Sequence, residues 1–490
     1  MLGRMYLGVD CGTSGLKALL TDEDGAAIAS ASCAYAPDRP KPNWSEQDPA
    51  VWRAAMAGAV ADIRASAGEA LGALTAVGFS GQMHGAVLLD ASDRPVRPAI
   101  LHNDMRASLE AAEIDREHPH LARLLGVKPM PGFIGPKLLW LARHEAELRS
   151  RIACVLAPKD YLRLALCGER AMDMSDAAGA WLLDEARRAW SLEAAEACRA
   201  EPAWLPPLIE GSSAAGQIRP AAAGEFGLPH GAVVAAGGGD AAVGAVGLGA
   251  IGPGDAFISL GTAMQLIVAA DRYLGTPERL VHSFAHALPN RWYAMAAMLN
   301  GAGALAFAAR LLGAPPDELD REAADGYDGP GALLFLPYLS GERTPLNDKD
   351  ARGVLFGMSE TTSRADVVRA VMEGVAMTLA EARDCLEAAG ARFDRVGITG
   401  GGARSRLWTR MIAAATGFEV VRMRGGETGP ALGAARLARL AATGESPEAV
   451  CRPPEIADVT RPDPKLADAF AGQRKRFKAL YKAVKAEFRR

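Results

Sequence analysis

No two of the seven cysteines in this 490-residue chain form a CxxC pair, and their number is odd. A disulfide framework or a zinc site is therefore not expected, and a reducing, cytoplasmic compartment is favoured. The formal net charge is −4, so the chain shows no basic excess of the kind that binds nucleic acid. No positively charged start leads into an apolar signal segment, so we do not expect export.

One apolar stretch, residues 231–252, is long enough to imitate a membrane span. It carries Asp240 at its centre and is rich in glycine, which predicts a strand, a tight loop and a small-residue helix instead. We therefore expect no membrane partner. Hydrophobic residues make up 49% of the chain and charged residues 23%, a balance that is typical of globular proteins and excludes wholesale disorder.

A chain of this length is too long for one hydrophobic core and fits two domains. Apolar strand patterns alternate with helical patterns, which favours an α/β fold. The break is expected near residues 247–253. This gives a first domain over residues 1–247, a second over 248–445 and a helical extension over 446–490. Within that extension, residues 474–490 are predicted to form a basic helix with a solvated face.

The same short pattern occurs once in each half of the chain. Residues 6–9 form an apolar run that breaks into a turn at 12–15. Residues 256–260 form another, which breaks at 261–262 before a further apolar run at 265–268. Backbone amides at such turns, with a Thr hydroxyl beside them, can hold phosphates. The pattern predicts two related domains that face each other across a cleft, although a ligand-free hairpin remains the alternative for a lone turn.

Phosphoryl transfer is the chemistry that these turns suggest. The candidate phosphate ligands are Gly12, Thr13, Ser14 and Lys17 in the first half and Gly261 and Thr262 in the second. Asp10, at the end of its strand, is a natural ligand for Mg²⁺ beside bound phosphates. Lys17 can reach the transferred phosphate as a point charge. The first turn does not match GxxxxGK[ST], so a P-loop NTPase is excluded.

Asp240 follows three glycines, residues 237–239, at the end of an apolar strand. Glycine lets the backbone turn sharply there and leaves the carboxylate accessible to solvent and to a ligand. A carboxylate in that place can orient an attacking hydroxyl and take its proton. The alternative is an Asp that caps the helix starting at Ala241, and the two roles are compatible.

Further loops supply the remaining candidate residues. A strand, a glycine run at 400–402 and a helix predict a nucleoside site that includes Gly401, Gly402 and Arg404. A second unit of the same kind surrounds a loop at 425–429. The loops at 81–85 and 102–106 offer polar groups for a substrate, namely Met83, His84, Asn103 and Asp104. For His84 a core histidine is the alternative. The GxGxxA-like run at 301–306 is predicted to open a packed helix.

Together these residues resemble the FGGY carbohydrate kinases of the actin-like ATPase superfamily, and most closely the xylulokinase branch. The similarity extends to about residue 445. Further blocks that carry it are residues 44–49, 81–85, 131–140, 158–163, 173–179 and 336–345. The resemblance implies an α/β fold with two ribonuclease-H-like domains around a central cleft, which close over ATP and a sugar. It leaves the oligomeric state open, a homodimer included.

The resemblance also implies roles for the candidate residues. Asp240 is the general base on the sugar hydroxyl and, with Asp10, serves Mg²⁺. Met83 and His84 line the ketose site, with Asn103 and Asp104 on the neighbouring loop. The two Gly-Thr turns hold the phosphates, and residues 401–404 lie along the adenosine. The implied activity is ATP-dependent phosphorylation of a primary hydroxyl, converting D-xylulose to D-xylulose 5-phosphate.

Two departures from the xylulokinase pattern flank the sugar. Ala241 stands where such kinases usually have Asn, and His102 where they usually have Trp. Loss of an amide that hydrogen-bonds a hydroxyl alters discrimination between substrates. Kinases for ribulose, glycerol or a tetritol therefore stay open as alternatives. Outside the sugar kinases, an actin-like filament or chaperone ATPase and a non-catalytic sugar-binding regulator are the competing classes.

Overall fold

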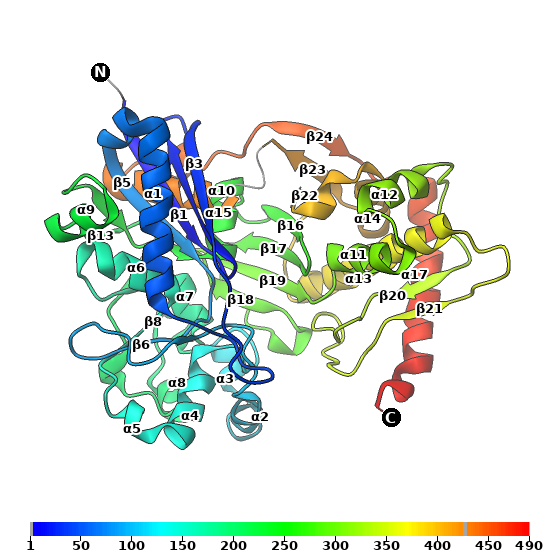
Figure 1. Ribbon diagram of the computed structural model, residues 1–490. Helices are drawn as coiled ribbons and strands as arrows, with labels where there is room; N and C mark the ends of the chain where they lie inside the picture. Colours follow the sequence, from blue (N-terminus) through cyan, green and yellow to red (C-terminus); the bar gives the residue numbers. More distant parts are fainter. Residues whose placement is uncertain (1–2, 425–428, 490) are drawn as a thin grey trace.

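The computed structural model describes residues 3–424 and 429–489. Two seven-stranded sheets lie side by side, each covered by helices (Figure 1). In the described part of the chain, no helix combines the length and the apolar character that crossing a bilayer requires.

The first sheet is built from the N-terminal half in the order β13-β14-β5-β1-β2-β3, and β15 pairs with β5. Its strands are β1 (Met5–Cys11), β2 (Gly15–Thr21), β3 (Ala27–Ala34), β5 (Leu74–Gly81), β13 (Ala214–Gln217), β14 (Val233–Ala235) and β15 (Gly238–Gly239). The central strand β1 runs antiparallel to β2 and parallel to β5.

The second sheet has the order β18-β19-β17-β16-β22-β23-β24. Its strands are β16 (Ala256–Leu260), β17 (Met264–Ala270), β18 (His282–Ala285), β19 (Trp292–Met298), β22 (Arg395–Thr399), β23 (Glu419–Met423) and β24 (Ile456–Thr460). From β19 to β24 its pairing directions repeat those of the first sheet from β3 to β13. The predicted pair of related α/β halves, each with a strand–Gly-Thr–strand unit, is confirmed.

Helices pack on both faces of the first sheet. One face carries α1 (Pro49–Gly72), with α6 (Pro158–Cys167) and α9 (Pro220–Phe226) beside it, and the other carries α10 (Asp240–Leu248) and α15 (Gly429–Thr443). Around the second sheet lie α11 (Ala302–Leu312), α12 (Pro316–Ala324), α13 (Arg364–Ala388), α14 (Arg406–Thr416) and α17 (Pro464–Val484) (Figure 1). Helix α13 begins with a capping box between Ser363 and Asp366, which stabilises its first turn.

The remaining elements are short. The helices are α2 (Ser108–Glu117), α3 (Leu121–Leu124), α4 (Ile134–His144), α5 (Ala146–Arg149), α7 (Met174–Gly179), α8 (Leu192–Ala197) and α16 (Pro447–Val450). The strands form two-stranded pairs: β4 (Glu46–Gln47) with β7 (Ala99–Ile100), β6 (Val87–Leu89) with β8 (Cys154–Leu156), β9 (Met172–Asp173) with β12 (Leu208–Ile209), β10 (Leu183–Asp184) with β11 (Ala189–Trp190), and β20 (Leu334–Leu336) with β21 (Val354–Phe356).

Helix α15 lies on the first sheet although it follows the second sheet's strand β23 in sequence. Its backbone comes unusually close, because β1 and β5 present glycines to it. A Cβ on Gly8 would lie 1.9 Å from the Ala431 carbonyl oxygen, and one on Gly78 would lie 2.0 Å from that of Ala434. Helix α15 thus connects the two halves of the molecule. The domain boundaries in the sequence remain a prediction.

The C-terminal segment differs in detail from its prediction. Residues 446–490 contribute a strand, β24, to the second sheet, and α17 begins at Pro464 rather than near residue 474. Helix α17 buries Phe470, Phe477 and Leu480 against the second half. Part of its basic face is paired, since Arg474 contacts both Glu381 and Asp384 of α13. The periodicity of the basic residues alone did not reveal this buried face.

Candidate active site

Asp10 and Asp240 approach each other at one edge of the first sheet. In the ladder, Asp10 pairs with Ser80, and Ser80 pairs with Gly238. One position further along, Gly81 pairs with Gly239, the residue immediately before Asp240. Parallel strands end at the same edge of a sheet, so residues far apart in sequence meet there. The predicted metal ligand and the predicted base are therefore brought together.

Asp240 is the first residue of α10, and its carboxylate accepts the N–H of Ala241 at 2.8 Å. The side chain is still exposed to solvent, although protein surrounds it at the edge of the sheet. Desolvation by that surrounding protein, together with the negative charge of Asp10, raises the pKa of Asp240 to about 7. The N-cap of α10 is Gly239, so Asp240 does not cap the helix as the alternative predicted. Its carboxylate accepts the N–H of the next residue and remains accessible, as a general base requires.

Asp10 has the environment of a cation ligand. Its Oδ1 is buried and has no hydrogen-bond partner within the protein. Burial raises the pKa of Asp10, and the hydroxyl of Ser80 and the charge of Lys17 only partly oppose that shift. A buried, unpartnered carboxylate oxygen beside a second carboxylate is a costly arrangement unless a cation joins it. Oxygen donors of this kind are what Mg²⁺ prefers, so the residues present fit that ion.

The first Gly-Thr turn is held by two glutamine side chains. Thr13 donates its hydroxyl to Oε1 of Gln82 at 3.0 Å, and Nε2 of Gln47 donates to the Thr13 carbonyl at 2.8 Å. Ser14 at the tip of the turn is exposed, and Lys17 lies on β2 opposite Asp10. No role for the two glutamines was predicted from the sequence. Their sequence signal was that they lie in residues 44–49 and 81–85, two of the blocks that carry the family resemblance.

The second Gly-Thr turn rests on the start of α11. The N–H of Ala302 donates to the Gly261 carbonyl at 2.6 Å, and the N–H of Gly301 donates to the Thr262 carbonyl at 2.9 Å. The side chain of Thr262 stays exposed. The GxGxxA-like run at 301–306 thus does open a packed helix, as predicted, and that helix supports the turn from behind.

The predicted nucleoside loop follows β22. Gly400 has φ = 93°, and a Cβ there would lie 2.6 Å from the Leu260 carbonyl oxygen. Only glycine fits this left-handed, close approach. Gly402 packs against Leu260, whereas Gly401 and Arg404 are exposed. The loop therefore lies beside the strand that ends in the second Gly-Thr turn. The other predicted wall, at residues 425–429, falls almost entirely outside the described residues.

His84 and Met83 lie on the loop after β5. Nδ1 of His84 is 2.7 Å from the carbonyl oxygen of Gly179, which can only accept, so Nδ1 carries the proton. Burial lowers the pKa of His84 well below its usual value, and His102 and Lys137 lower it further. The neutral ring therefore leaves Nε2 as an acceptor, suited to a hydroxyl group. Met83 is buried, and the Tyr293 hydroxyl from the second sheet reaches its sulfur at 3.8 Å.

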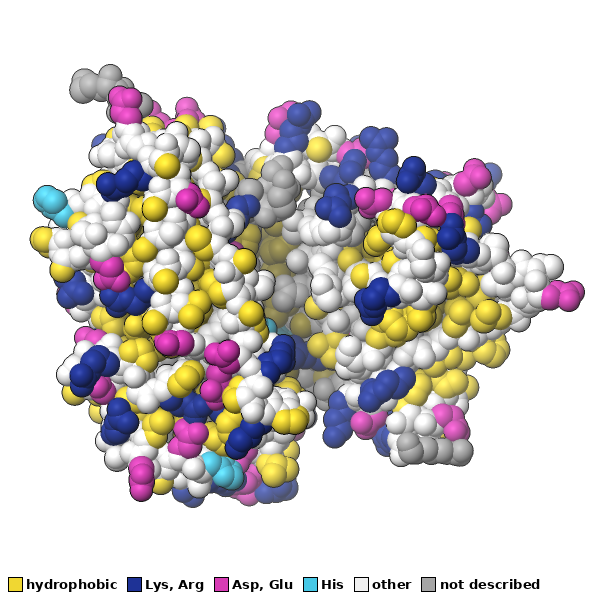
Figure 2. All heavy atoms as spheres, viewed as in Figure 1, with side chains coloured by type: hydrophobic (Ala, Val, Ile, Leu, Met, Phe, Trp, Pro, Cys, Tyr) yellow, Lys and Arg dark blue, Asp and Glu magenta, His cyan; other side chains and the backbone are white. Residues whose placement is uncertain are grey.

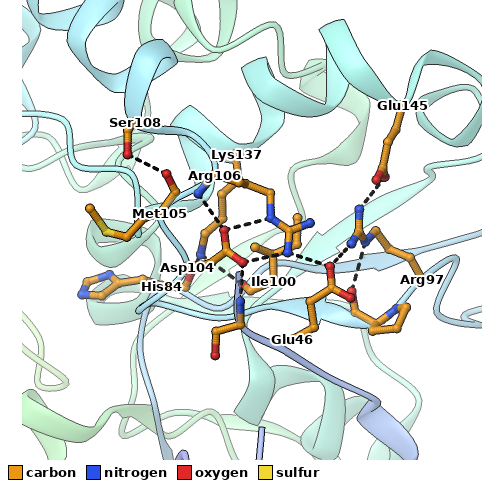
Figure 3. A network of polar contacts seen from close by, with 12 residues as sticks. Glu46, His84, Arg97, Ile100, Asp104, Met105, Arg106, Ser108, Lys137 and Glu145 are labelled. Atoms are coloured by element: carbon orange, nitrogen blue, oxygen red, sulfur yellow. Dashed lines mark hydrogen bonds and ion pairs between the residues drawn. The ribbon is translucent and has the colours of Figure 1, made fainter. Parts of the chain in front are cut away.

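Asn103 and Asp104 have different environments although they are adjacent. Asn103 is exposed, whereas Asp104 is fully buried and accepts from the Ser45 N–H and from Arg106 (Figure 3). Arg106 also pairs with Glu46 at 2.6 Å. The Asp104 carboxylate is thus occupied within the protein. It anchors the loop that presents Asn103 and His102, and the structure does not bring it out toward a ligand.

A groove separates the two halves of the molecule on the face shown in Figure 2. Below it the halves contact each other through β18 and β19. The carboxylate of Glu185 accepts the N–H of Ala285 at 2.7 Å, and the Glu185 carbonyl accepts from the Trp292 indole at 2.9 Å. The second sheet therefore contacts the first half at Glu185, while each sheet carries its own Gly-Thr turn. A two-domain enzyme that closes over its substrates requires such an arrangement.

Comparison with known proteins identifies the family. Sequence models of the FGGY family of carbohydrate kinases match the chain, the N-terminal domain over residues 5–247 and the C-terminal domain over 256–442. Xylulose kinases from Klebsiella pneumoniae and Escherichia coli (strain K12) are 43% and 42% identical to it, over 98% of this chain and 99% of theirs. The crystal structure of a xyloylose kinase from Brucella ovis superposes with a TM-score of 0.96 at 45% identity, covering 98% of this chain and 99% of that one. This chain belongs to the FGGY family of carbohydrate kinases, which phosphorylate sugars with ATP.

Proposed function

We propose that this enzyme transfers the γ-phosphoryl group of ATP to the primary hydroxyl of D-xylulose and releases D-xylulose 5-phosphate in the cytoplasm. The observation that carries the proposal is the position of Asp240. It is accessible beside the end of β5, which leads into the loop of Met83 and His84, and it lies near Asp10, whose strand β1 leads into the phosphate turn at 12–15. The xylulose kinases that align with nearly the whole chain support the choice of sugar.

The residues have the following proposed roles. Asp240 orients the attacking hydroxyl and accepts its proton as the bond to phosphorus forms. Nε2 of His84 accepts a hydrogen bond from another sugar hydroxyl, and Met83 and Asn103 line the same site. The phosphates lie between the two Gly-Thr turns near Lys17, and the adenosine lies along Gly401, Gly402 and Arg404. Asp10 and Asp240 would hold Mg²⁺, which would neutralise charge on the phosphates.

A second candidate is a kinase for another ketose or polyol. It is favoured by His102 and Ala241, which stand at the two positions that flank the sugar. Burial, with the nearby charges of Lys137 and Arg343, lowers the pKa of His102 to about 4, so the ring is neutral. Its buried Nδ1 has no partner within the described protein. An unpartnered ring nitrogen at this place is available to a hydroxyl that an indole ring could not bind in the same way.

A coupled ADP-release assay over D-xylulose, D-ribulose, L-ribulose, erythritol and glycerol tests the proposal. We expect kcat/KM to be highest for D-xylulose and to require Mg²⁺. The variants His102→Trp and Ala241→Asn restore the usual xylulokinase residues, and we expect them to narrow the range of accepted sugars. A higher kcat/KM for glycerol or a tetritol than for D-xylulose would reject the proposed substrate in favour of the second candidate.

A further inference from the structure

Lys159 is a fully buried cation at the start of α6. Its ammonium group contacts three carboxylates, those of Asp160, Asp173 and Asp176, the last two at 2.9 and 3.3 Å. Burial lowers the pKa of Lys159, but the three carboxylates outweigh it and raise the pKa above its usual value. The carboxylates lie close enough together to surround a metal ion, and the ammonium group occupies that position. A buried charge cluster of this kind is rigid, because any displacement leaves a charge unpaired.

The cluster extends by hydrogen bonds toward the candidate active site. Asp173 caps α7 and accepts both the N–H of Ser175, at 2.7 Å, and its hydroxyl, at 2.5 Å. The Ser175 oxygen in turn accepts the N–H of Gly239 at 2.9 Å. All of these groups are buried. The chain of contacts therefore begins at Lys159 and ends on the backbone immediately before Asp240.

The backbone of Gly239 has little room to move in other directions. Strand β15 is paired with β5 on one side. A Cβ on Gly239 would lie 2.4 Å from Cγ of Met83. Met83, a residue of the proposed sugar site, therefore packs directly against the backbone of Gly239. The N–H of Gly239 is held by its hydrogen bond to the Ser175 oxygen. Two consecutive glycines are flexible by themselves, so an external constraint is needed to fix the residue that follows them.

We propose that Ser175 is a positioning residue for phosphoryl transfer. Anchored by Asp173 and Lys159, its hydroxyl holds the Gly239 amide and so fixes the direction from which Asp240 meets the acceptor hydroxyl. This inference rests on the proposed role of Asp240. Ser175 does not touch the substrate; it acts through the backbone. A displacement of about 1 Å at a reacting group can cost up to a hundredfold in rate.

Ser175→Ala removes the acceptor for the Gly239 N–H and the hydroxyl that donates to Asp173, while Asp173 keeps the Ser175 N–H and the Lys159 ammonium group as partners. We expect kcat to fall about tenfold while KM for sugar and for ATP changes by less than about twofold, because the lost interaction matters only in the transition state. The matched control is Ser191→Ala. Ser191 is also a buried serine whose oxygen accepts a backbone N–H, that of Ala194 at 3.1 Å, at the start of α8. Both variants are expected to melt a few degrees lower, but Ser191→Ala should keep wild-type kcat.

A double-mutant cycle with Asp240→Ala separates positioning from a general structural effect. If Ser175 acts through Asp240, then Ser175→Ala should lower kcat in the wild type but leave the residual rate of Asp240→Ala within about twofold. An equal loss in both backgrounds, or a kcat as high as in Ser191→Ala, overturns the positioning role. A normal rate for Asp240→Ala alone would instead remove the proposed base, and the inference with it. If Ser175→Ala does not fold, Ser175→Cys provides the same cycle, since a thiol is a weak acceptor for the Gly239 N–H.

Discussion

The side-chain amide of Gln82 donates to Oε1 of Gln47 at 3.1 Å. Gln82 also accepts from the Thr13 hydroxyl and lies directly before Met83 and His84. Gln47 donates to the Thr13 carbonyl, and its neighbour on β4, Glu46, pairs with Arg106 beside the Asn103 loop. Successive side chains of a strand point to opposite faces, so β4 contacts the phosphate turn with one residue and the sugar loop with the next. Strand β4 therefore connects the hydrogen bonds of the phosphate turn with those of the sugar loop.

Gln82→Ala should weaken ATP binding. The change leaves the Thr13 hydroxyl without its acceptor in Gln82, and Oε1 of Gln47 keeps only the Trp52 indole as a donor. A lost hydrogen bond in such a setting costs about 1–2 kcal/mol. We expect KM for ATP to rise by about 5–30-fold in steady-state assays. Gln217→Ala, on the exposed face of the edge strand β13, is the control and should behave as wild type. A KM for ATP within twofold of wild type in Gln82→Ala would contradict the role of Gln82 in holding the phosphate turn.

Lys137→Met should affect the sugar and not the nucleotide. The Lys137 ammonium group is fully buried and donates to the carbonyls of His84 and Ile100 at 2.8 and 3.0 Å (Figure 3). Its loss takes the ammonium donor away from the His84 carbonyl, whereas the Ile100 carbonyl keeps the N–H of Ala86 as a donor. We expect KM for the sugar to rise at least about tenfold with KM for ATP nearly unchanged. The control is Lys128→Met, at an exposed lysine paired with Asp115, and it should change neither KM. Equal increases in KM for the sugar and for ATP in Lys137→Met would refute a role of Lys137 that is local to the sugar site.

Gly78→Ala should destabilise the fold through α15. The added Cβ would lie 2.0 Å from the Ala434 carbonyl oxygen, and neither backbone can yield without displacing the helix from the sheet. We expect a loss of at least about 3 kcal/mol in the free energy of unfolding, measured with denaturant and circular dichroism. Gly72→Ala, where a Cβ meets no atom within 4 Å, should change it by less than about 0.5 kcal/mol. Similar stabilities for the two variants would show that α15 does not pack as described.

Asp10→Asn should lower the pKa of Asp240 below its value of about 7 in the protein without nucleotide. The negative charge of Asp10 favours the protonated form of Asp240, so its removal favours the ionised form. Titration of ¹³C-labelled aspartate carboxyl groups by NMR measures the shift directly. Asp22→Asn, on a surface turn away from the site, should leave it unchanged. An unchanged or higher pKa for Asp240 in Asp10→Asn would mean that the two carboxylates do not interact.

Much of the fold could be predicted from local pattern. The strand–turn–strand units and the packed helix after Gly301 depend on neighbouring residues, so periodicity and turn chemistry were sufficient to find them. The position of α15 on the first sheet could not be found this way. It depends on glycines about 350–420 residues earlier in the chain, at positions 8 and 78, whose only sequence signal is a missing side chain.

The site was predictable to a similar extent. Asp10 lies near the end of β1 and Asp240 directly follows β15, and the common edge of parallel strands brings them together. Asp104 was grouped with Asn103 because both are polar, but only the fold shows that Ser45 and Arg106 already occupy its carboxylate. The links from Gln47 to Thr13 and from Ser175 to Gly239 join segments that are distant in sequence. A single sequence carries no signal for such pairs.

Turnover by Asp240→Ala with ATP, Mg²⁺ and D-xylulose decides whether this carboxylate is the base of the reaction. We expect kcat to fall by about 10²–10⁴-fold, while ATP binding, followed by calorimetry, stays close to wild type. A kcat within a few-fold of wild type, with D-xylulose 5-phosphate still formed, would contradict the proposed mechanism.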